Sequence, residues 1–204
     1  ARQRGFYLDR GARSISSVEA MKTIAFEIAE QLAARLEPQE PGRWLAPDWY
    51  IQAVSGGIGP LGVQKGFGEL LKMGWVEKIP AFGLIQTEGC SPMVQAWKQG
   101  LEKAEPVLSP RTHIATLSTG DPGRSYTLLQ ARLRRGGGGE FESVSDEEAF
   151  RAMHVIAKME GLSVEPAAAV AVGGLIKLVR AGKIKPTSTV KLNPANGHYY
   201  EAVT

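Results

Sequence analysis

The sequence contains almost no cysteine and no long apolar run. Cys90 is its only cysteine among 204 residues, which excludes an internal disulfide framework and fits a reducing compartment. No apolar stretch approaches the roughly 20 residues that a membrane-spanning helix needs, and the first residues lack the apolar core of a signal peptide. We therefore expect a cytoplasmic protein without a membrane partner.

An excess of charge of one sign is also lacking. Lys and Arg number 24 against 21 Asp and Glu, which gives a net charge of +3, and the basic residues are spread along the chain. The tightest basic cluster, Arg132, Arg134 and Arg135, is better explained by the end of a helix than by nucleic acid. We therefore predict no nucleic-acid partner. His154 falls inside a predicted helix, where we expect a packed or surface histidine and no metal ligand.

Helical and strand patterns alternate along the chain. Helices are predicted at 18–37, 61–74, 92–104, 126–135, 146–161 and 167–182, and strands at 49–54, 81–89, 140–144, 162–164 and 188–193. The first helix carries an apolar stripe that we expect to pack on a sheet, formed by Ile24, Ile28, Leu32 and Leu36. Ser145 and Glu148 have the spacing of a capping box. The alternation predicts a three-layer α/β/α domain with a mainly parallel, twisted sheet.

A glycine-rich loop directly follows the first predicted strand. Residues 55–62 read SGGIGPLG, in which Gly57, Gly59 and Gly62 match the pattern G-x-G-x-x-G. A helix that starts here offers unpaired N–H groups to an anion, and glycines let phosphate oxygens approach the backbone. Glu88 ends the next strand, where dinucleotide-binding folds place a ribose-binding acid. The loop alone leaves three possibilities open: a dinucleotide, another phosphate compound, or a turn with no ligand.

Landmarks on both sides of this loop resemble the pyridoxal-phosphate enzymes of the tryptophan-synthase-β fold group, also called fold type II. Within that group they look like threonine synthase and its relatives. The segment 47–80 looks like the family's strand, phosphate loop and helix, and 83–97 like the strand and helix after them. The segment 118–178 is similar to the distal half, including a Glu-Pro before a small-residue helix. The resemblance covers almost all of the chain, and it implies the large, cofactor-binding domain of such an enzyme.

The resemblance implies a site for pyridoxal 5′-phosphate and no metal. The implied cofactor-binding residues are Ser55, Gly56, Gly57, Ile58, Gly59, Asn196 and Glu165. The loop would present backbone N–H groups to the 5′-phosphate, and Ser55 either adds a hydroxyl or only ends the strand. Asn196 stands roughly where the family sets a Ser or Thr against the pyridine nitrogen, and a neutral partner there suits elimination and replacement chemistry. Glu165 either lies near the cofactor or shapes the turn before Pro166.

The resemblance further implies a Schiff-base lysine in a Ser-x-Lys segment nearer the N-terminus of the enzyme. None of the eleven lysines of this chain stands in such a segment. We therefore expect no catalytic residue here. We interpret residues 1–204 as the carboxy-terminal part of the large domain, with 1–16 as the segment that returns from a small domain. By itself, this chain is expected to be inactive.

We predict that this chain is part of a pyridoxal-phosphate-dependent lyase of amino-acid biosynthesis. A threonine-synthase-like enzyme would convert O-phosphohomoserine to threonine by elimination and water addition. A serine/threonine dehydratase or a cysteine or cysteate synthase is the alternative within the family. An NAD-binding oxidoreductase using GIGPLG, or a non-catalytic phosphate-binding fragment, is the alternative outside it. The expected partners are a small amino-acid substrate and a second copy of the full-length enzyme in a homodimer.

Overall fold

The structure, a computed structural model, describes residues 2–5, 14–36 and 42–193. The helices are α1 (Ile15–Leu36), α2 (Ile58–Lys72), α3 (Pro92–Lys98), α4 (Arg124–Arg135), α5 (Asp146–Glu160) and α6 (Pro166–Arg180). The strands are β1 (Trp49–Ala53), β2 (Ala81–Thr87), β3 (Gly139–Val144) and β4 (Val190–Asn193). Two short 3-10 turns complete the order, η1 (Arg2–Arg4) and η3 (Ala115–Leu117).

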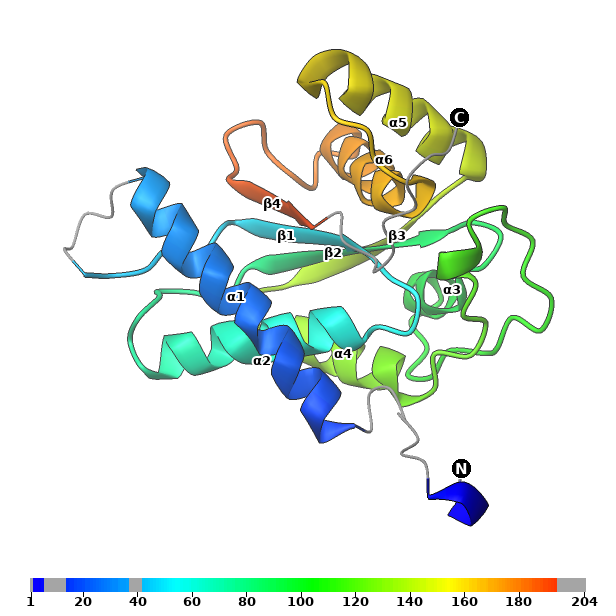
Figure 1. Ribbon diagram of the computed structural model, residues 1–204, viewed down its shortest axis with the longest axis horizontal. Helices are drawn as coiled ribbons and strands as arrows, with labels where there is room; N and C mark the ends of the chain where they lie inside the picture. The colour runs from blue at the N-terminus through cyan, green and yellow to red at the C-terminus, as the bar shows by residue number, and fades with distance from the viewer. Residues whose placement is uncertain (1, 6–13, 37–41, 194–204) are drawn as a thin grey trace.

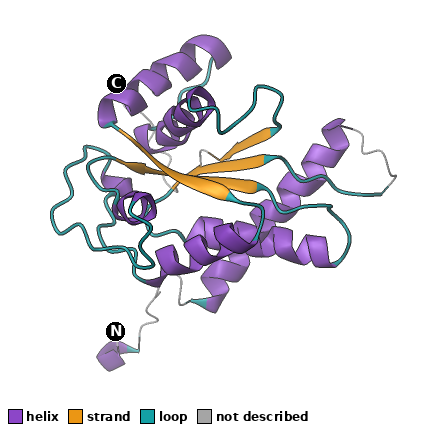
Figure 2. Ribbon diagram, turned by 180° about the vertical axis from the view of Figure 1, so that it is seen from behind, coloured by secondary structure: helices purple, strands orange, loops and turns teal. Residues whose placement is uncertain are grey.

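The four strands form one parallel sheet with the order β3-β2-β1-β4. In the register, Tyr50 of β1 is opposite Phe82 of β2 on one side and Lys191 of β4 on the other. Helices α1 to α4 lie on one face of the sheet and α5 and α6 on the other, as Figures 1 and 2 show. One buried apolar cluster fills each side of the sheet. The predicted three-layer α/β/α architecture with a parallel sheet is therefore confirmed.

Most predicted elements are present, but three differ from the expectation. The strand predicted at 162–164 is wrong: Gly161 ends α5 and Glu165 caps α6, so three residues cannot reach the sheet and return. Helix α3 ends at Lys98 instead of 104, because the chain turns at Gly100 with φ of 70°. Helix α2 begins at Ile58, three residues before the predicted start, so the glycine loop contributes its own first turn.

The first helix packs in a different way from the prediction. Its buried residues are Ala25, Ile28, Ala29 and Ala33, whereas Leu36 of the expected apolar stripe is 54% exposed. The reason is that α1 packs on α2. Among the described elements, these two helices form the most extensive contact. A Cβ at Gly62 would overlap Met21, and a Cβ at Gly66 would lie 2.7 Å from the Cβ of Ala25. Small residues on both helices therefore allow α1 to pack on α2, and α2 to separate α1 from most of the sheet.

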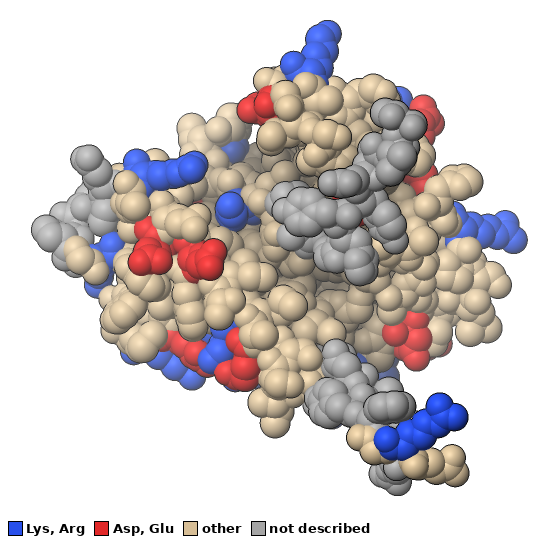
Figure 3. Space-filling view, viewed as in Figure 1, with Lys and Arg blue, Asp and Glu red and all other residues tan. Residues whose placement is uncertain are grey.

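Charged residues are dispersed over the surface. On the face drawn in Figure 3, Lys and Arg side chains stand between Asp and Glu side chains. The cluster of Arg132, Arg134 and Arg135 forms the last turn of α4, as predicted, where the helix dipole favours positive charge. None of the helices within the described ranges is long and apolar enough to cross a membrane.

The packing of α2 on α1 gives a testable prediction. Gly62→Ala should lower the free energy of unfolding by about 1–3 kcal/mol, because the added Cβ overlaps Met21 and would lie 2.6 Å from the carbonyl oxygen of Val18. Gly68→Ala in the same helix is the matched control, since its Cβ would meet only Ile79 at 3.9 Å. This control should be neutral or stabilising by up to about 1 kcal/mol. Urea denaturation measures both, and equal effects of the two changes would contradict the packing account.

Candidate functional site

The site predicted from the sequence lies at the carboxyl edge of the sheet. Because the strands are parallel, the loops after β1, β2 and β3 all leave from this edge, at the right of Figure 1. Helix α6 runs in the opposite direction: Gly174 lies against Ile85, and Leu178 lies against Gly83 nearer the amino edge. The first turn of α6, with Glu165 as its cap, therefore also belongs to the carboxyl edge.

The glycine loop presents a row of free backbone donors. Gly57 caps α2 with φ of 82°, a conformation that glycine adopts without steric cost. No acceptor within the described part of the chain takes the N–H groups of residues 55–59, and four of these five residues are only half-buried. The next residue, Pro60, has no N–H, and Leu61 already donates to the carbonyl of Gly57 at 3.4 Å. Five adjacent N–H groups at a positive helix end form a binding place for an anion.

The loop is held by contacts that leave no room for side chains. A Cβ at Gly57 would lie 3.1 to 3.2 Å from Leu129, Met93 and Ser125, and a Cβ at Gly59 would lie 2.8 Å from Nε2 of Gln52. At Gly56, by contrast, a Cβ would meet no atom of the described residues within 4 Å. The loop is thus packed against the protein at Gly57 and Gly59 and open at Gly56, which is the side from which a ligand can reach the backbone.

A buried polar network lies under the loop. The amide of Asn193 donates to the hydroxyl of Tyr50 at 2.7 Å, and that hydroxyl donates to Oε1 of Gln52 at 2.8 Å. All three residues are at most 9% exposed. Burial raises the pKa of Tyr50 although the hydrogen bond from Asn193 opposes it, so the phenol stays neutral. The network ties β4 to β1 directly below Gly59, and sequence reasoning missed it because each residue lies in an ordinary strand.

Two polar side chains at the end of β2 have hydrogen-bonding capacity to spare. Oε1 of Gln86 accepts the N–H groups of Met93 and Val94 at 2.9 and 3.2 Å, so it caps α3 from inside the sheet. Nε2 of Gln86 and Oγ1 of Thr87 are buried and have no hydrogen-bond partner among the residues that the structure describes. Such groups are uncommon in folded proteins. Since neighbouring strand residues face opposite sides, these two atoms mark both faces of the carboxyl edge as polar.

Lys177 of α6 joins three segments behind this edge. Its ammonium lies 3.0 Å from Glu148 and 3.3 Å from Glu88, and it donates to the carbonyl of Ser143 at 2.8 Å. Burial alone would lower the pKa of Lys177, but Glu148 and Glu88 outweigh it and raise that pKa. Lys177 is therefore a permanent cation. The carboxylate of Glu88 is already paired, which weakens the interpretation that Glu88 binds a ribose.

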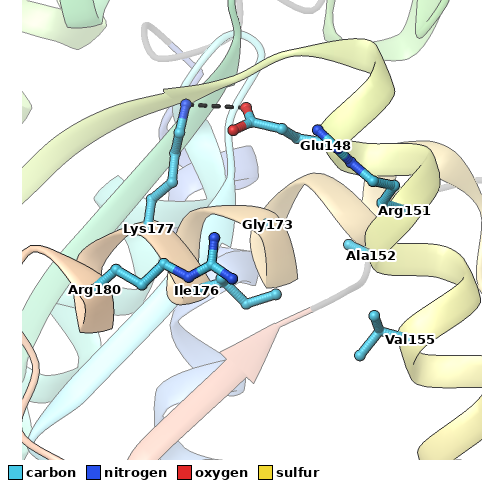
Figure 4. Close-up of a pocket in the computed structure, with 8 residues that line it drawn as sticks. All are labelled: Glu148, Arg151, Ala152, Val155, Gly173, Ile176, Lys177 and Arg180. Atoms are coloured by element: carbon cyan, nitrogen blue, oxygen red, sulfur yellow. Dashed lines mark ion pairs between the residues drawn. The ribbon is translucent and has the colours of Figure 1, made fainter.

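A groove of about 290 Å³ lies between α5 and α6, on the face of the sheet opposite α2. Figure 4 shows its lining, in which Lys177 points to Glu148 and the aliphatic side chains of Val155 and Ile176 lie between the two helices. Arg151 and Arg180 are at its rim. None of the lining residues comes from the glycine loop, so this groove is separate from the site predicted from the sequence.

The other residues singled out in the sequence lie in different surroundings. Glu165 caps α6 through its backbone, and its side chain makes no capping hydrogen bond. The hydroxyl of Ser55, two residues beyond the end of β1, makes a 2.5 Å hydrogen bond with Thr119. Asn196 lies outside the described residues. Cys90 is buried, and burial raises the pKa of its thiol. Within the described ranges, no group of His, Cys, Asp and Glu side chains could hold a metal ion.

Comparison with known sequences identifies a family and several relatives of this chain. The family described as "Pyridoxal-phosphate dependent enzyme" matches residues 1–194. The threonine synthase of Methanosarcina acetivorans is 36% identical over 173 residues, which cover 85% of this chain and 40% of the relative. The cysteate synthase of Methanosphaerula palustris is 31% identical over 214 residues, which cover 96% of this chain and 46% of the relative. The chain thus spans less than half the length of these relatives.

Solved structures show the same fold. The processed form of threonine deaminase isoform 2 from Solanum lycopersicum has a TM-score of 0.62 at 14% identity, covering 85% of this chain and 43% of that chain. A fungal L-serine ammonia-lyase from Rhizomucor miehei has a TM-score of 0.59 at 21% identity, covering 85% of this chain and 49% of that chain. At these identities the likeness establishes the fold and nothing further.

The contacts of Lys177 predict a pH-dependent stability. Lys177→Met should lower the free energy of unfolding by about 1–2 kcal/mol at pH 7, because Glu88 and Glu148 lose their shared cation. Burial alone would raise the pKa of Glu148, but the N–H of Ser145 and the ammonium of Lys177 outweigh it and lower that pKa. A carboxylate with a lowered pKa stabilises the fold above its unfolded-state pKa, and this contribution disappears as the pH falls through the folded-state pKa.

The difference between wild type and Lys177→Met should therefore shrink below about pH 4. Denaturant unfolding at pH 7 and at about pH 3.5 measures it. Lys158→Met, which removes an exposed lysine from the last turn of α5, is the control. A difference that stays constant or grows towards acid pH would show that the ion pairs do not carry the effect.

Proposed function

This chain belongs to the pyridoxal-phosphate dependent enzyme family, and on that premise we propose that it forms the cofactor-binding part of a threonine-synthase-like lyase. The observation that carries the proposal is the row of five N–H groups at residues 55–59 that have no acceptor in the described part of the chain, in a chain that matches the family over residues 1–194. In this proposal, residues 1–204 are the carboxy-terminal part of the large domain of a longer enzyme.

The residues present fit the phosphate of the cofactor. A phosphate monoester needs several hydrogen-bond donors and close access to the backbone, and the loop supplies five donors with open space at Gly56. The cap at Gly57 directs the positive end of α2 to the same place. Nε2 of Gln86 and Oγ1 of Thr87, which have no partner among the described residues, lie at the same edge of the sheet, on its two faces.

Pyridoxal phosphate, when bound, supplies an electron sink that weakens bonds at the carbon atoms of an amino acid. The residues of this chain would bind and orient the phosphate end. The loop donates backbone N–H groups to it, and the network of Asn193, Tyr50 and Gln52 keeps the strand ends below the loop in place.

None of the eleven lysines of this chain stands in a Ser-x-Lys segment, and six of them are paired with carboxylates in the structure. Lys177 is a permanent cation, and the pKa of Lys22 is also raised, chiefly by hydrogen bonds to Glu19 and Glu69. Several others form ion pairs with carboxylates: Lys65, Lys78, Lys98 and Lys183. A lysine that acts as a nucleophile needs a lowered pKa instead. We infer that this lysine comes from a part of the enzyme outside these 204 residues.

The proposed reaction is conversion of O-phosphohomoserine to threonine, as in the threonine synthases that this chain resembles. A cysteate synthase activity is the second candidate, favoured by the alignment that covers 96% of this chain. The full-length enzyme, loaded with cofactor, tests the choice by the amino acid formed. Threonine from O-phosphohomoserine supports the first candidate, and cysteate formation without threonine overturns it.

Binding of the cofactor phosphate can be tested without catalysis. Pyridoxine 5′-phosphate is the probe, because it keeps the phosphate but has no aldehyde to react with surface lysines. We expect the protein to bind it in equilibrium dialysis, and to bind pyridoxine and NAD more weakly. Gly56→Ala should weaken binding of the phosphate ester about tenfold or more, since the new Cβ occupies the open side of the loop.

The stability of Gly56→Ala should change by less than about 0.5 kcal/mol, because a Cβ at this position meets no described residue within 4 Å. Gly68→Ala is the matched control, as its Cβ would lie in the middle of α2 with an ordinary 3.9 Å contact to Ile79, and it should bind like the wild type. Tighter binding of NAD, or equal binding of Gly56→Ala and wild type, would contradict the proposed site.

A further inference from the structure

We propose that Thr119 is a positioning residue of the phosphate site, and that it orients the hydroxyl of Ser55 towards the phosphate group of a bound pyridoxal compound. This inference rests on the proposed function. It adds a residue that lies 64 positions from the loop in sequence. It also gives a structural role to the segment 106–123, which has none in the proposed function.

The two hydroxyl groups are in direct contact. Oγ of Ser55 and Oγ1 of Thr119 lie 2.5 Å apart, and either can be the donor. A pair of hydroxyls has two protons, of which one is used in the mutual hydrogen bond. The second proton has no acceptor in the part of the chain that the structure describes, so it can be donated to an anion. Ser55 begins the row of free N–H groups, so this proton is available at the edge of the phosphate loop.

Thr119 belongs to the segment 106–123, which we call the strap, and contacts within the strap fix its position. The strap is the green segment at the right of Figure 1. The N–H of Val107 donates to the carbonyl of Gly120 at 2.9 Å, which closes the strap on itself next to Thr119. A Cβ at Gly120 would overlap the carbonyl of Val107. The backbone at Gly120 is therefore packed closely against Val107, and this contact restricts the position of Thr119, the residue before it.

Further contacts fix the strap to the sheet. The N–H of Arg111 donates to the carbonyl of Gly89 at 2.9 Å, in the turn that follows β2. Asp146 at the start of α5 accepts the hydroxyl of Thr112 and the N–H of His113, both at 2.6 Å. These contacts tie the strap to the loops after β2 and β3, at the carboxyl edge.

Two apolar side chains of the strap are buried. Ile114 and Leu117 are 4% and 1% exposed, in the apolar cluster below α6. Thr119 follows only two residues after Leu117, and its β-branched side chain has few rotamers. Its hydroxyl is thus presented to Ser55 by a segment anchored on both sides, which reduces the entropy lost when a ligand binds.

The test compares variants of Thr119 by their affinity for pyridoxine 5′-phosphate. Thr119→Val keeps the shape but removes the hydroxyl, and should weaken binding about fivefold to thirtyfold, since the hydroxyl of Ser55 is then no longer oriented for its hydrogen bond to the charged phosphate. Thr119→Ser should stay within about threefold of the wild type, because it restores the hydroxyl. Thr127→Val is the matched control: its hydroxyl donates to the carbonyl of Glu102, and its binding should be unchanged.

A double-mutant cycle separates positioning from packing. Ser55→Ala should weaken binding about as much as Thr119→Val, and the double variant should be little worse than either single variant, because both remove the same interaction. Additive losses would overturn the proposal. If Thr119→Val does not fold, as judged by circular dichroism, the comparison of Ser55→Ala with Thr119→Ser replaces it: a loss of affinity only in Ser55→Ala supports the pair, and no loss in Ser55→Ala overturns it.

These measurements distinguish a failure of the proposed function from a failure of the role proposed for Thr119. Wild-type protein that binds no pyridoxine 5′-phosphate contradicts the proposed function itself. Wild-type protein that binds the probe while Thr119→Val binds it within twofold of the wild type leaves the proposed function intact and overturns the role of Thr119. The phosphorus-31 chemical shift of the bound probe gives a second measure, which should differ between wild type and Thr119→Val and agree between wild type and Thr127→Val.

Discussion

The close approach of α2 to its neighbours is the constraint on which the carboxyl edge of this sheet depends. Gly62 and Gly66 bring the helix against α1, and Gly57 brings its cap against α3 and α4. Gly59 brings the first turn against Gln52. Because each of these contacts excludes a Cβ, the helix has one position relative to β1. Its free N–H groups are consequently fixed in space before any ligand arrives, which is what an anion site requires.

The local parts of the fold could be predicted from the sequence. The strand, glycine loop and helix at 49–72 are contiguous, and the capping box of Ser145 and Glu148 depends on residues three apart. The burial of α1 could not be predicted, because apolar periodicity indicates which face is hydrophobic but not that a glycine-bearing helix will pack there. The strand predicted at 162–164 was wrong for a related reason. A short apolar pattern fits a strand, but only the positions of the neighbouring helices show that this segment has no strand to pair with.

The candidate site could be predicted to the same extent. Ser55 and Gly56 to Gly59 follow from the loop itself, whereas its supports are distant in sequence: Thr119 is 64 residues from Ser55, and Lys177 is 89 residues from Glu88. Such pairs leave no local pattern. They explain why G-x-G-x-x-G could not decide between ligands, and why the membership of the chain in a family was needed. In the structure, Gly62 serves helix packing and Glu88 is paired with a lysine, so two of the residues that suggested a dinucleotide have other tasks.

The central claim is that the loop at residues 55–59 holds the phosphate of a pyridoxal compound. A crystal structure of the protein with pyridoxine 5′-phosphate tests it most directly. Phosphate oxygens are expected within about 2.7–3.2 Å of backbone nitrogen atoms of the loop, with the hydroxyl of Ser55 as a further donor. A phosphate bound instead between α5 and α6, against Arg151 and Arg180, with the loop N–H groups left without a ligand, would contradict it.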